Sequence, residues 1–211
     1  MPALLQFAFV AFTSIFVLVD PIAAVPTFLA MTGDKCDRGR RRHMAVRAAW
    51  TCFFVLLTFS LAGTLIFKLF GITLAAFKIA GGVILGLIGM DMLRAKRSAT
   101  KETPSETEEG SEKEDVGIIP LGIPMLAGPG SISTVMVLMS QNADWPHAVV
   151  VVCAIAATAL VSFLVLAAAD KVSSYLHETG IRILTRMMGL LLTAIAVQFV
   201  LNGLKDAGFT R

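Results

Sequence analysis

Six apolar stretches, each long enough to cross a lipid bilayer, dominate the sequence. A spanning helix needs about 20 predominantly apolar residues, because the hydrocarbon core is about 30 Å thick and a helix rises about 1.5 Å per residue. The stretches cover residues 4–31, 44–67, 72–93, 117–139, 148–169 and 183–204. The chain has 56% hydrophobic and 16% charged residues and a mean hydropathy of +0.78, values typical of membrane proteins and not of soluble domains. We therefore expect an all-α membrane protein with six transmembrane helices.

The basic residues gather on one side of this predicted topology. Fourteen of the 18 fall in or beside the first, third and fifth loops: Lys35, Arg38, Arg40, Arg41, Arg42, Arg47, Arg94, Lys96, Arg97, Lys101, Lys113, Lys171, Arg182 and Arg186. Because cytoplasmic loops retain positive charge, we expect these three loops in the cytoplasm and both termini on the outer side. The net charge of +3 is explained by this orientation and by contact with anionic lipid, so it does not indicate a nucleic-acid partner.

The third loop divides the chain into two sets of three helices. Residues 95–116 are rich in Glu, Ser, Thr and Lys and cannot bury enough apolar area to fold, which indicates a flexible charged cytoplasmic linker. Shifting the second half by 108 residues aligns three pairs without a gap: Pro21 with Pro129, Gly81 with Gly189, and Lys78 with Arg186. Equivalent helices of two three-helix halves cross a membrane in opposite directions. The sequence therefore predicts two inverted repeats, residues 1–94 and 117–211.

The first and fourth apolar stretches each contain a proline that follows a favoured helix cap. The two segments are "LVDPIAAVPTFL", residues 18–29, and "MLAGPGSIST", residues 125–134. Proline is well tolerated at the first position of a helix, and Asp and Gly are favoured as the cap residue just before it. A helix is therefore expected to restart at Pro21 and at Pro129. Non-helical backbone inside a membrane survives only where it is buried in protein or lines a wet cavity. We therefore predict that helices one and four are interrupted, as in many secondary transporters.

The residues at the two interruptions suit the two ends of a zwitterion. The N-terminus of a half-helix presents free N–H groups to a carboxylate, and the second interruption supplies Gly128, Pro129, Gly130, Ser131, Ser133 and Thr134 for this role. Asp20, just before Pro21, would pair with an ammonium group or a coupling ion, because ionisable residues within spans are functional candidates. In the structural alternative, Asp20 is a helix cap and the hydroxyls bond to their own helix.

Two further patterns leave alternatives open. Gln198 and Asn202 are four residues apart and share a helix face, so Gln198 either extends a polar path to the substrate or bonds a neighbouring helix. Gly82, Gly86 and Gly89 form a small-residue face that allows close helix packing, within one chain or in an oligomer. The sequence has no zinc-spaced His/Cys cluster, no phosphate-binding loop and no serine-hydrolase elbow. We therefore expect no metal, no cofactor and no enzymatic activity.

Four segments resemble successive signatures of the MarC family of six-helix integral membrane proteins. They are "LVDPIAAVPTFL", "FKIAGGVILGLIGMDML", "VGIIPLGIPMLAGPGSISTVMVL" and "RMMGLLLTAIAVQFVLNGL", and the resemblance covers nearly the whole chain. One departure is visible, because members of that family often have Gly after "DPI" where this chain has Ala23. A very close backbone approach is therefore not expected at Ala23.

The resemblance implies a multi-pass inner-membrane protein related to amino-acid exporters, some of them described as transporters of glycine, alanine and similar amino acids. We therefore expect a secondary transporter in which one inverted repeat rocks against the other. Its partners would be a zwitterionic small molecule, a coupling ion (proton or sodium) and membrane lipid. The alternative is a non-transporting scaffold or regulator in which the prolines only shape the helix bundle.

Overall fold

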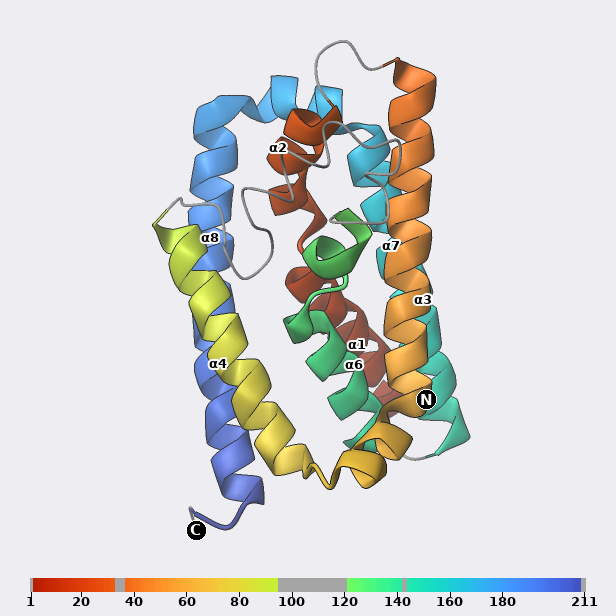
Figure 1. The fold of residues 1–211 in the computed structure, drawn as a ribbon, viewed down its shortest axis with the longest axis vertical. Helices are drawn as coiled ribbons and strands as arrows, with labels where there is room; N and C mark the ends of the chain where they lie inside the picture. The colour runs from red at the N-terminus through yellow and green to blue at the C-terminus, as the bar shows by residue number, and fades with distance from the viewer. Residues whose placement is uncertain (1, 33–36, 95–120, 142–143, 210–211) are drawn as a thin grey trace.

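The computed structural model describes residues 2–32, 37–94, 121–141 and 144–209, and these residues form helices without any strand (Figure 1). In chain order the helices are α1 (Pro2–Val19), α2 (Pro21–Thr32), α3 (Arg38–Phe70), α4 (Leu74–Leu93), η1 (Leu121–Leu126), α6 (Pro129–Gln141), α7 (Trp145–Ala167) and α8 (Ala169–Asp206). The prediction of an all-α protein is confirmed for this part of the chain. The predicted linker, residues 95–116, lies outside the described residues, so the proposed division into two repeats around it stays a prediction.

Five segments of the described chain are long and apolar enough to cross a membrane: Ala3–Leu29, Arg38–Gly63, Leu74–Leu93, Trp145–Ala167 and Thr179–Asp206. The fourth predicted span, residues 117–139, is described from Leu121 onward and is interrupted, as the sequence predicts. In its place are the short π-helical segment η1 and then α6, whose apolar part Pro129–Ser140 is shorter than a full span. The proline at position 129 has no N–H to continue a helix from η1, so the chain restarts there.

The fifth predicted loop, residues 170–182, connects the last two spans as expected but is itself largely helical. The chain forms α8 from Ala169 onward, with one non-helical residue at His177 (φ 53°, ψ 169°). Figure 1 shows the first part of α8 running across one end of the molecule before the helix turns and follows its long axis. This first part carries Asp170 and Lys171, so its sequence lacks the long apolar run by which spanning helices are recognised.

The end of α3 and the starts of α3 and α4 are set by residues next to them in the sequence. The Asp37 side chain accepts a hydrogen bond from the Gly39 N–H (3.0 Å) and caps α3, which ends at Gly71 in the left-handed conformation (φ 62°). Only glycine adopts that conformation without strain, so Gly71 allows the chain to reverse into α4. Thr73 then caps α4 by accepting from the Ala76 N–H at 3.1 Å. The α3–α4 hairpin is therefore specified by its own sequence.

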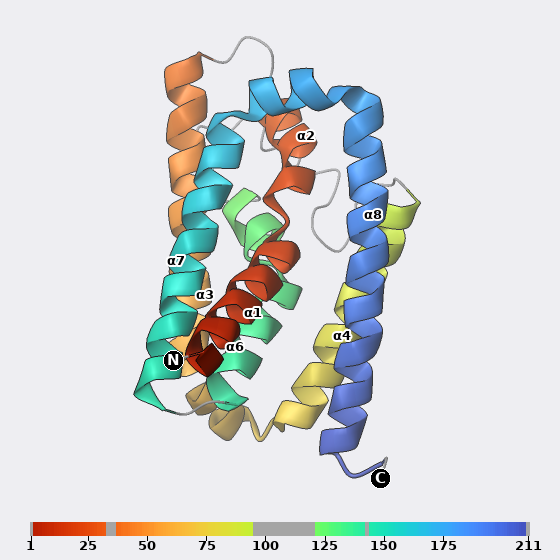
Figure 2. The same ribbon diagram turned by 180° about the vertical axis from the view of Figure 1, so that it is seen from behind.

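The most extensive helix contact joins α4 to α8 and is lined by glycines (Figures 1 and 2). A Cβ on Gly82 would lie 2.8 Å from the Ala196 carbonyl oxygen, and a Cβ on Gly203 would lie 2.9 Å from the Ala75 carbonyl oxygen. Such distances leave no room for any side chain between the two backbones. The small-residue face predicted on residues 82–89 therefore packs within one chain, against α8.

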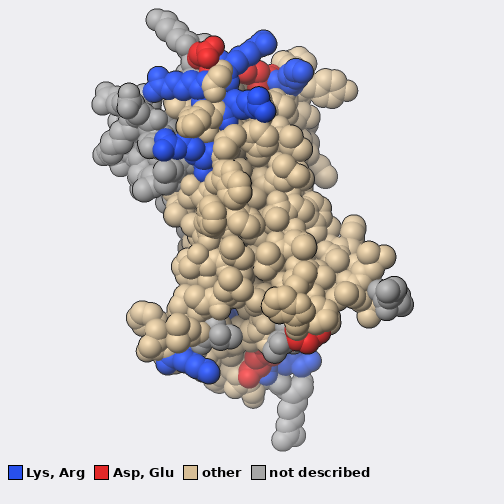
Figure 3. Space-filling model, turned by 90° about the vertical axis from the view of Figure 1, so that its right-hand side faces the viewer, with Lys and Arg blue, Asp and Glu red and all other residues tan. Residues whose placement is uncertain are grey.

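Basic side chains are concentrated at one end of the molecule. Figure 3 shows most of the visible Lys and Arg side chains at its upper end and a tan apolar middle below them. The same end in Figure 1 contains the start of α3 and the junction of α7 with α8, whereas both ends of the described chain lie toward the opposite end. The two ends of the bundle therefore differ in charge as the sequence predicts for the two sides of a membrane.

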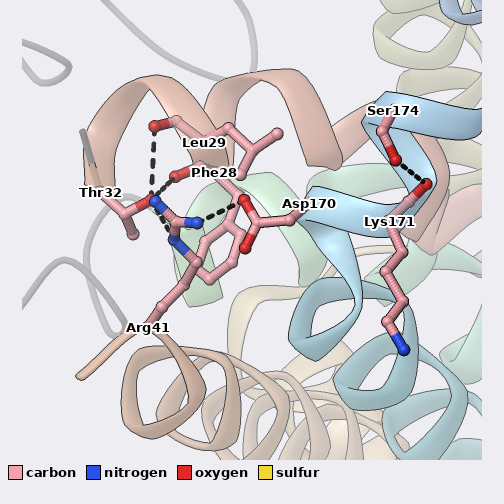
Figure 4. Close-up of polar contacts among 7 residues, drawn as sticks. All are labelled: Phe28, Leu29, Thr32, Arg41, Asp170, Lys171 and Ser174. Carbon is pink, nitrogen blue, oxygen red and sulfur yellow. Dashed lines mark hydrogen bonds and ion pairs between the residues drawn. The ribbon is translucent and has the colours of Figure 1, made fainter. Parts of the chain in front are cut away.

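Arg41 ties three helices together at this basic end (Figure 4). Its Nε donates to Thr32 Oγ1, the last residue of α2, at 3.2 Å, and its Nη1 forms an ion pair with Asp170 in the first turn of α8. The Arg41 side chain is 11% exposed and the Asp170 side chain 56% exposed. Arg41 therefore connects α2 and α3 of the first half to α8 of the second.

Replacing Arg41 by glutamine should lower the melting temperature of the detergent-purified protein. Charge-assisted hydrogen bonds contribute about 1.5–3 kcal/mol when shielded and less when exposed, so a loss of about 1–2 kcal/mol is expected. Arg40→Gln, an exposed neighbour in the same turn, is the matched control and should melt like the wild type. Equal melting temperatures for the two variants would show that the Arg41 contacts contribute nothing measurable.

Candidate functional site at two helix interruptions

Asp20 forms the first interruption. It adopts the left-handed conformation with φ 47°, which Asp tolerates better than most residues. Its N–H donates to the Phe16 carbonyl at 2.9 Å and closes α1, while its Oδ1 accepts from the Ala23 N–H at 3.3 Å and caps α2. The residue is only 2% exposed. The sequence correctly predicts the helix restart at Pro21, and the capping role weighed as an alternative for Asp20 is present.

The second interruption lies between η1 and α6. The Ala127 N–H donates to the Gly122 carbonyl at 3.0 Å, a one-turn π-helical bond, and α6 then restarts at Pro129 as predicted. Ser131 Oγ donates to backbone carbonyls across the break, at 3.0 Å to Gly128 and 3.3 Å to Leu126. Its single proton is thus used by the protein backbone. Ser131 stabilises the break, and its hydroxyl is not free to donate to a carboxylate at the same time.

The two interruptions lie side by side inside the molecule. Figures 1 and 2 place both near mid-height, where α1 contacts α6 and α2 contacts η1. Val19, just before the first break, and Ala127, just before the second, belong to one buried apolar cluster. Figure 1 also shows α1 and α2 running away from the end that carries the N-terminus, whereas η1 and α6 run toward it. The interrupted helices therefore cross antiparallel at their breaks.

Most of the predicted site residues are buried at this crossing. The polar ones, Asp20, Ser131, Ser133 and Thr134, are 2%, 1%, 2% and 3% exposed. Pro21, Gly128 and Gly130 are buried as well, and Pro129 is half-buried. These residues are thus shielded from solvent.

Thr134 is distinctive among these residues. Within the described part of the chain its Oγ1 is buried and has no hydrogen-bond partner. A buried hydroxyl without a partner costs about 1–3 kcal/mol, so such groups are usually paired with a ligand or with water. Ser133 instead packs on α4, where a Cβ on Gly81 would lie 2.6 Å from Ser133 Oγ. Of the three predicted hydroxyls, that of Thr134 is therefore the best able to bind a polar ligand.

Two predicted site residues take other roles. A Cβ on Gly130 would lie 2.3 Å from Leu85 Cδ2 and 3.7 Å from Leu18 Cδ2, so the space beside this glycine is filled by apolar side chains and not by a ligand. Gln198 is exposed on α8, where its Nε2 donates to Asn202 Oδ1 at 2.8 Å. The two side-chain amides are hydrogen-bonded to each other, away from the buried residues of the crossing. The structure thus does not bring Gln198 to the helix interruptions.

Thr158 and Ser162 on α7 are buried polar residues that sequence reasoning missed. Both are 0% exposed, Ser162 Oγ donates to the Thr158 carbonyl at 2.8 Å, and Thr158 Oγ1 has no hydrogen-bond partner among the described residues. Helix α7 packs against both α1 and α2, the helices on either side of Asp20. Their spacing of four within an apolar span is the signal that could have identified them. The described residues contain no group of three His, Cys, Asp or Glu side chains that could hold a metal ion.

Comparison with known proteins agrees with a membrane role. The family model described as "MarC family integral membrane protein" matches residues 5–207. A UPF0056 membrane protein of Methanocaldococcus jannaschii is 42% identical over 96% of this chain and 98% of its own. The UPF0056 membrane proteins YvbG of Bacillus subtilis and YhcE of Escherichia coli are 38% and 32% identical over 95% and 92% of this chain, and over 96% and 90% of their own. No solved structure matches the chain. The resemblance seen in the sequence is thereby confirmed, and the chain belongs to the MarC family of integral membrane proteins.

Proposed function

We propose that the protein is a secondary transporter of small neutral amino acids of the glycine and alanine type. The observation that carries the proposal is the antiparallel crossing of two interrupted helices, with a buried carboxylate on one and a helix N-terminus on the other. Half-helices meeting inside a membrane protein form substrate sites in many secondary transporters. A carboxylate in a span is itself a functional candidate.

The substrate would lie between the two breaks. The first-turn N–H groups of α6 and the hydroxyl of Thr134 would bind its carboxylate, and Asp20 would bind its ammonium group or a coupling ion, a proton or sodium. Leu18 and Leu85 already fill the space beside Gly130. A site bounded by these side chains favours substrates with a very small side chain, because a larger one would need the packed leucines to move.

The helix contacts support the proposed inverted repeats. If α1, α2, α3 and α4 are exchanged with η1, α6, α7 and α8, the contact of α3 with η1 becomes that of α7 with α1, and α3 with α6 becomes α7 with α2. The contact of α4 with α6 likewise becomes that of α8 with α2. The α3–α7 and α4–α8 contacts map onto themselves. Such correspondence is expected of two halves related by a two-fold axis in the membrane plane.

Alternating access would be controlled by ion pairs at the two ends of the bundle. Arg41 and Asp170 connect the halves at the basic end, and Lys78 Nζ binds Asp206 Oδ2 at 2.6 Å between α4 and α8 toward the other end. We propose that the basic end faces the cytoplasm and that both termini lie outside the inner membrane.

A thermal shift assay tests the proposed binding site. Because a ligand that binds only the folded state raises the melting temperature, glycine, alanine or serine should stabilise the purified protein. Thr134→Val removes the unpartnered hydroxyl at nearly constant volume and should reduce this shift. Thr13→Val, the same substitution at a threonine of α1, is the control and should leave the ligand-induced shift unchanged. No shift with any small neutral amino acid would contradict the proposal.

The second candidate function is a non-transporting scaffold or regulator in which the interruptions are purely structural. It is favoured by the backbone hydrogen bonds of Ser131 and by the capping role of Asp20. Cysteines placed at positions 131 and 133, in a background without native cysteines, distinguish the two. A transporter should expose them to a small water-soluble thiol reagent in membranes and protect them with substrate. Cysteines that never react would favour the scaffold.

A further inference from the structure

One face of α3 changes from basic to aromatic along its length. Arg40, His43, Arg47, Trp50 and Phe54 follow each other at spacings of three or four residues, which places them on one stripe of the helix. Trp50 and Phe54 are each 56% exposed. The stripe begins in the first turn of α3, which lies at the basic end of the molecule (Figure 1), and Trp50 follows Arg47 by about one helical turn.

Trp50 stands between two hollows. The first, of about 340 Å³, lies between α3 and α7 and is lined by Ala49, Trp50, Phe53, Ala159, Leu160 and Phe163, among others. The second, of about 390 Å³, lies on the surface of α3 and is lined by Arg47, Trp50, Thr51, Phe54 and Val55. The side chains that line the first are aliphatic or aromatic, and the small alanines of α3 and α7 leave the space between them open.

The Trp50 ring is held in place as a ridge by its neighbours. It stacks on Phe54 with ring centroids 5.4 Å apart and meets Phe53 edge to face at 5.7 Å. Aromatic pairs in these arrangements are favourable. Tryptophan is also the residue that membrane proteins place at the level of lipid headgroups. The ridge and its two hollows therefore lie about one helical turn beyond Arg47, where the basic residues of the stripe give way to aromatic ones.

We propose that this face binds one anionic phospholipid, with its phosphate at Arg47 and its two acyl chains on either side of Trp50. An arginine offers five N–H donors in a planar fork that suits a phosphate. It can therefore bind a phosphate and keep a hydrogen bond to another partner at the same time. His43 and Arg40, one and two turns before Arg47, add positive charge that favours an anionic headgroup over a zwitterionic one. The inference rests on membrane location and does not depend on what the protein transports.

Tryptophan quenching by brominated lipid tests the proposal directly. The chain has two tryptophans, so the Trp145→Phe variant reports on Trp50 alone. It is reconstituted into phosphatidylcholine bilayers containing equal small fractions of either brominated phosphatidylglycerol or brominated phosphatidylcholine. We expect phosphatidylglycerol to associate about fivefold more strongly than phosphatidylcholine at Trp50, the preference given by one basic residue near an anionic headgroup.

Matched variants assign the preference to Arg47. Arg47→Gln should remove most of the preference for phosphatidylglycerol, Arg47→Lys should retain more of it than Arg47→Gln does, and Lys68→Gln, near the other end of α3, should not change it. The complementary Trp50→Phe variant, which keeps the exposed Trp145, should show no preference. Equal quenching of Trp50 by both lipids would overturn the proposal in favour of ordinary boundary lipid. Absence of quenching by either would overturn it in favour of a protein cover, such as a second copy of the chain.

Discussion

Replacing Gly89 by alanine should lower the melting temperature more than any other single methyl addition on α4. A Cβ there would lie 2.4 Å from Thr193 Oγ1 and 2.9 Å from the Gly189 carbonyl oxygen. Thr193 cannot easily turn away, because its hydroxyl donates to that same carbonyl at 2.8 Å. The helices must therefore separate, and overpacking of this kind costs about 1–3 kcal/mol. Thermal unfolding in detergent measures the loss.

Gly86→Ala is the matched control on the same helix. A Cβ at this position would lie 3.7 Å from Ala196 Cβ, an ordinary van der Waals distance. Alanine is also the better helix former by about 0.5–1 kcal/mol. This variant should therefore melt at or above the wild-type temperature. If Gly86→Ala and Gly89→Ala melted alike, α4 and α8 would not pack in the way described.

Replacing Asp20 by alanine should destabilise the protein and remove substrate binding together. Alanine cannot accept the Ala23 N–H, which costs about 1 kcal/mol for a lost cap. It also tolerates the left-handed conformation poorly, at a further cost of about 1–2 kcal/mol. A loss of about 2–3 kcal/mol would lower the melting temperature whether or not Asp20 binds a ligand.

Asp20→Asn separates structure from function at this position. Asparagine caps helices and adopts the left-handed conformation about as well as aspartate, so the variant should fold with near wild-type stability. It lacks the negative charge, so the rise in melting temperature with alanine or glycine should disappear. If Asp20→Asn kept the full ligand-induced rise, Asp20 would be a helix cap and no more.

The helix interruptions could be predicted from the sequence because their causes are local. Pro21 and Pro129 each follow a favoured cap residue, Asp20 or Gly128, which indicates a helix restart, and glycines at helical spacing indicate close packing. The first part of α8 could not be found by hydropathy, because a short charged helix across the end of a bundle has no long apolar run. Its break at His177 has no proline or glycine at that residue to indicate it.

The content of the candidate site depended on contacts between distant segments, and the sequence predicted it less well. Nothing in the amino-acid sequence around Gly130 indicates that Leu85, on another helix, fills the space beside this glycine. Whether Ser131 bonds a substrate or its own backbone is likewise decided by the three-dimensional path of η1. Thr134 was one of three candidate hydroxyls, and only packing distinguishes it from Ser131 and Ser133.

The most direct test of the proposed function is uptake of radiolabelled alanine into liposomes that contain the purified protein. The protein should carry alanine faster than protein-free liposomes do, with saturation and with competition by glycine. Asp20→Asn liposomes, prepared with equally folded protein, should show only the background rate. Wild-type liposomes that take up alanine, glycine and serine no faster than protein-free liposomes, in the presence of proton and sodium gradients, would contradict the proposal.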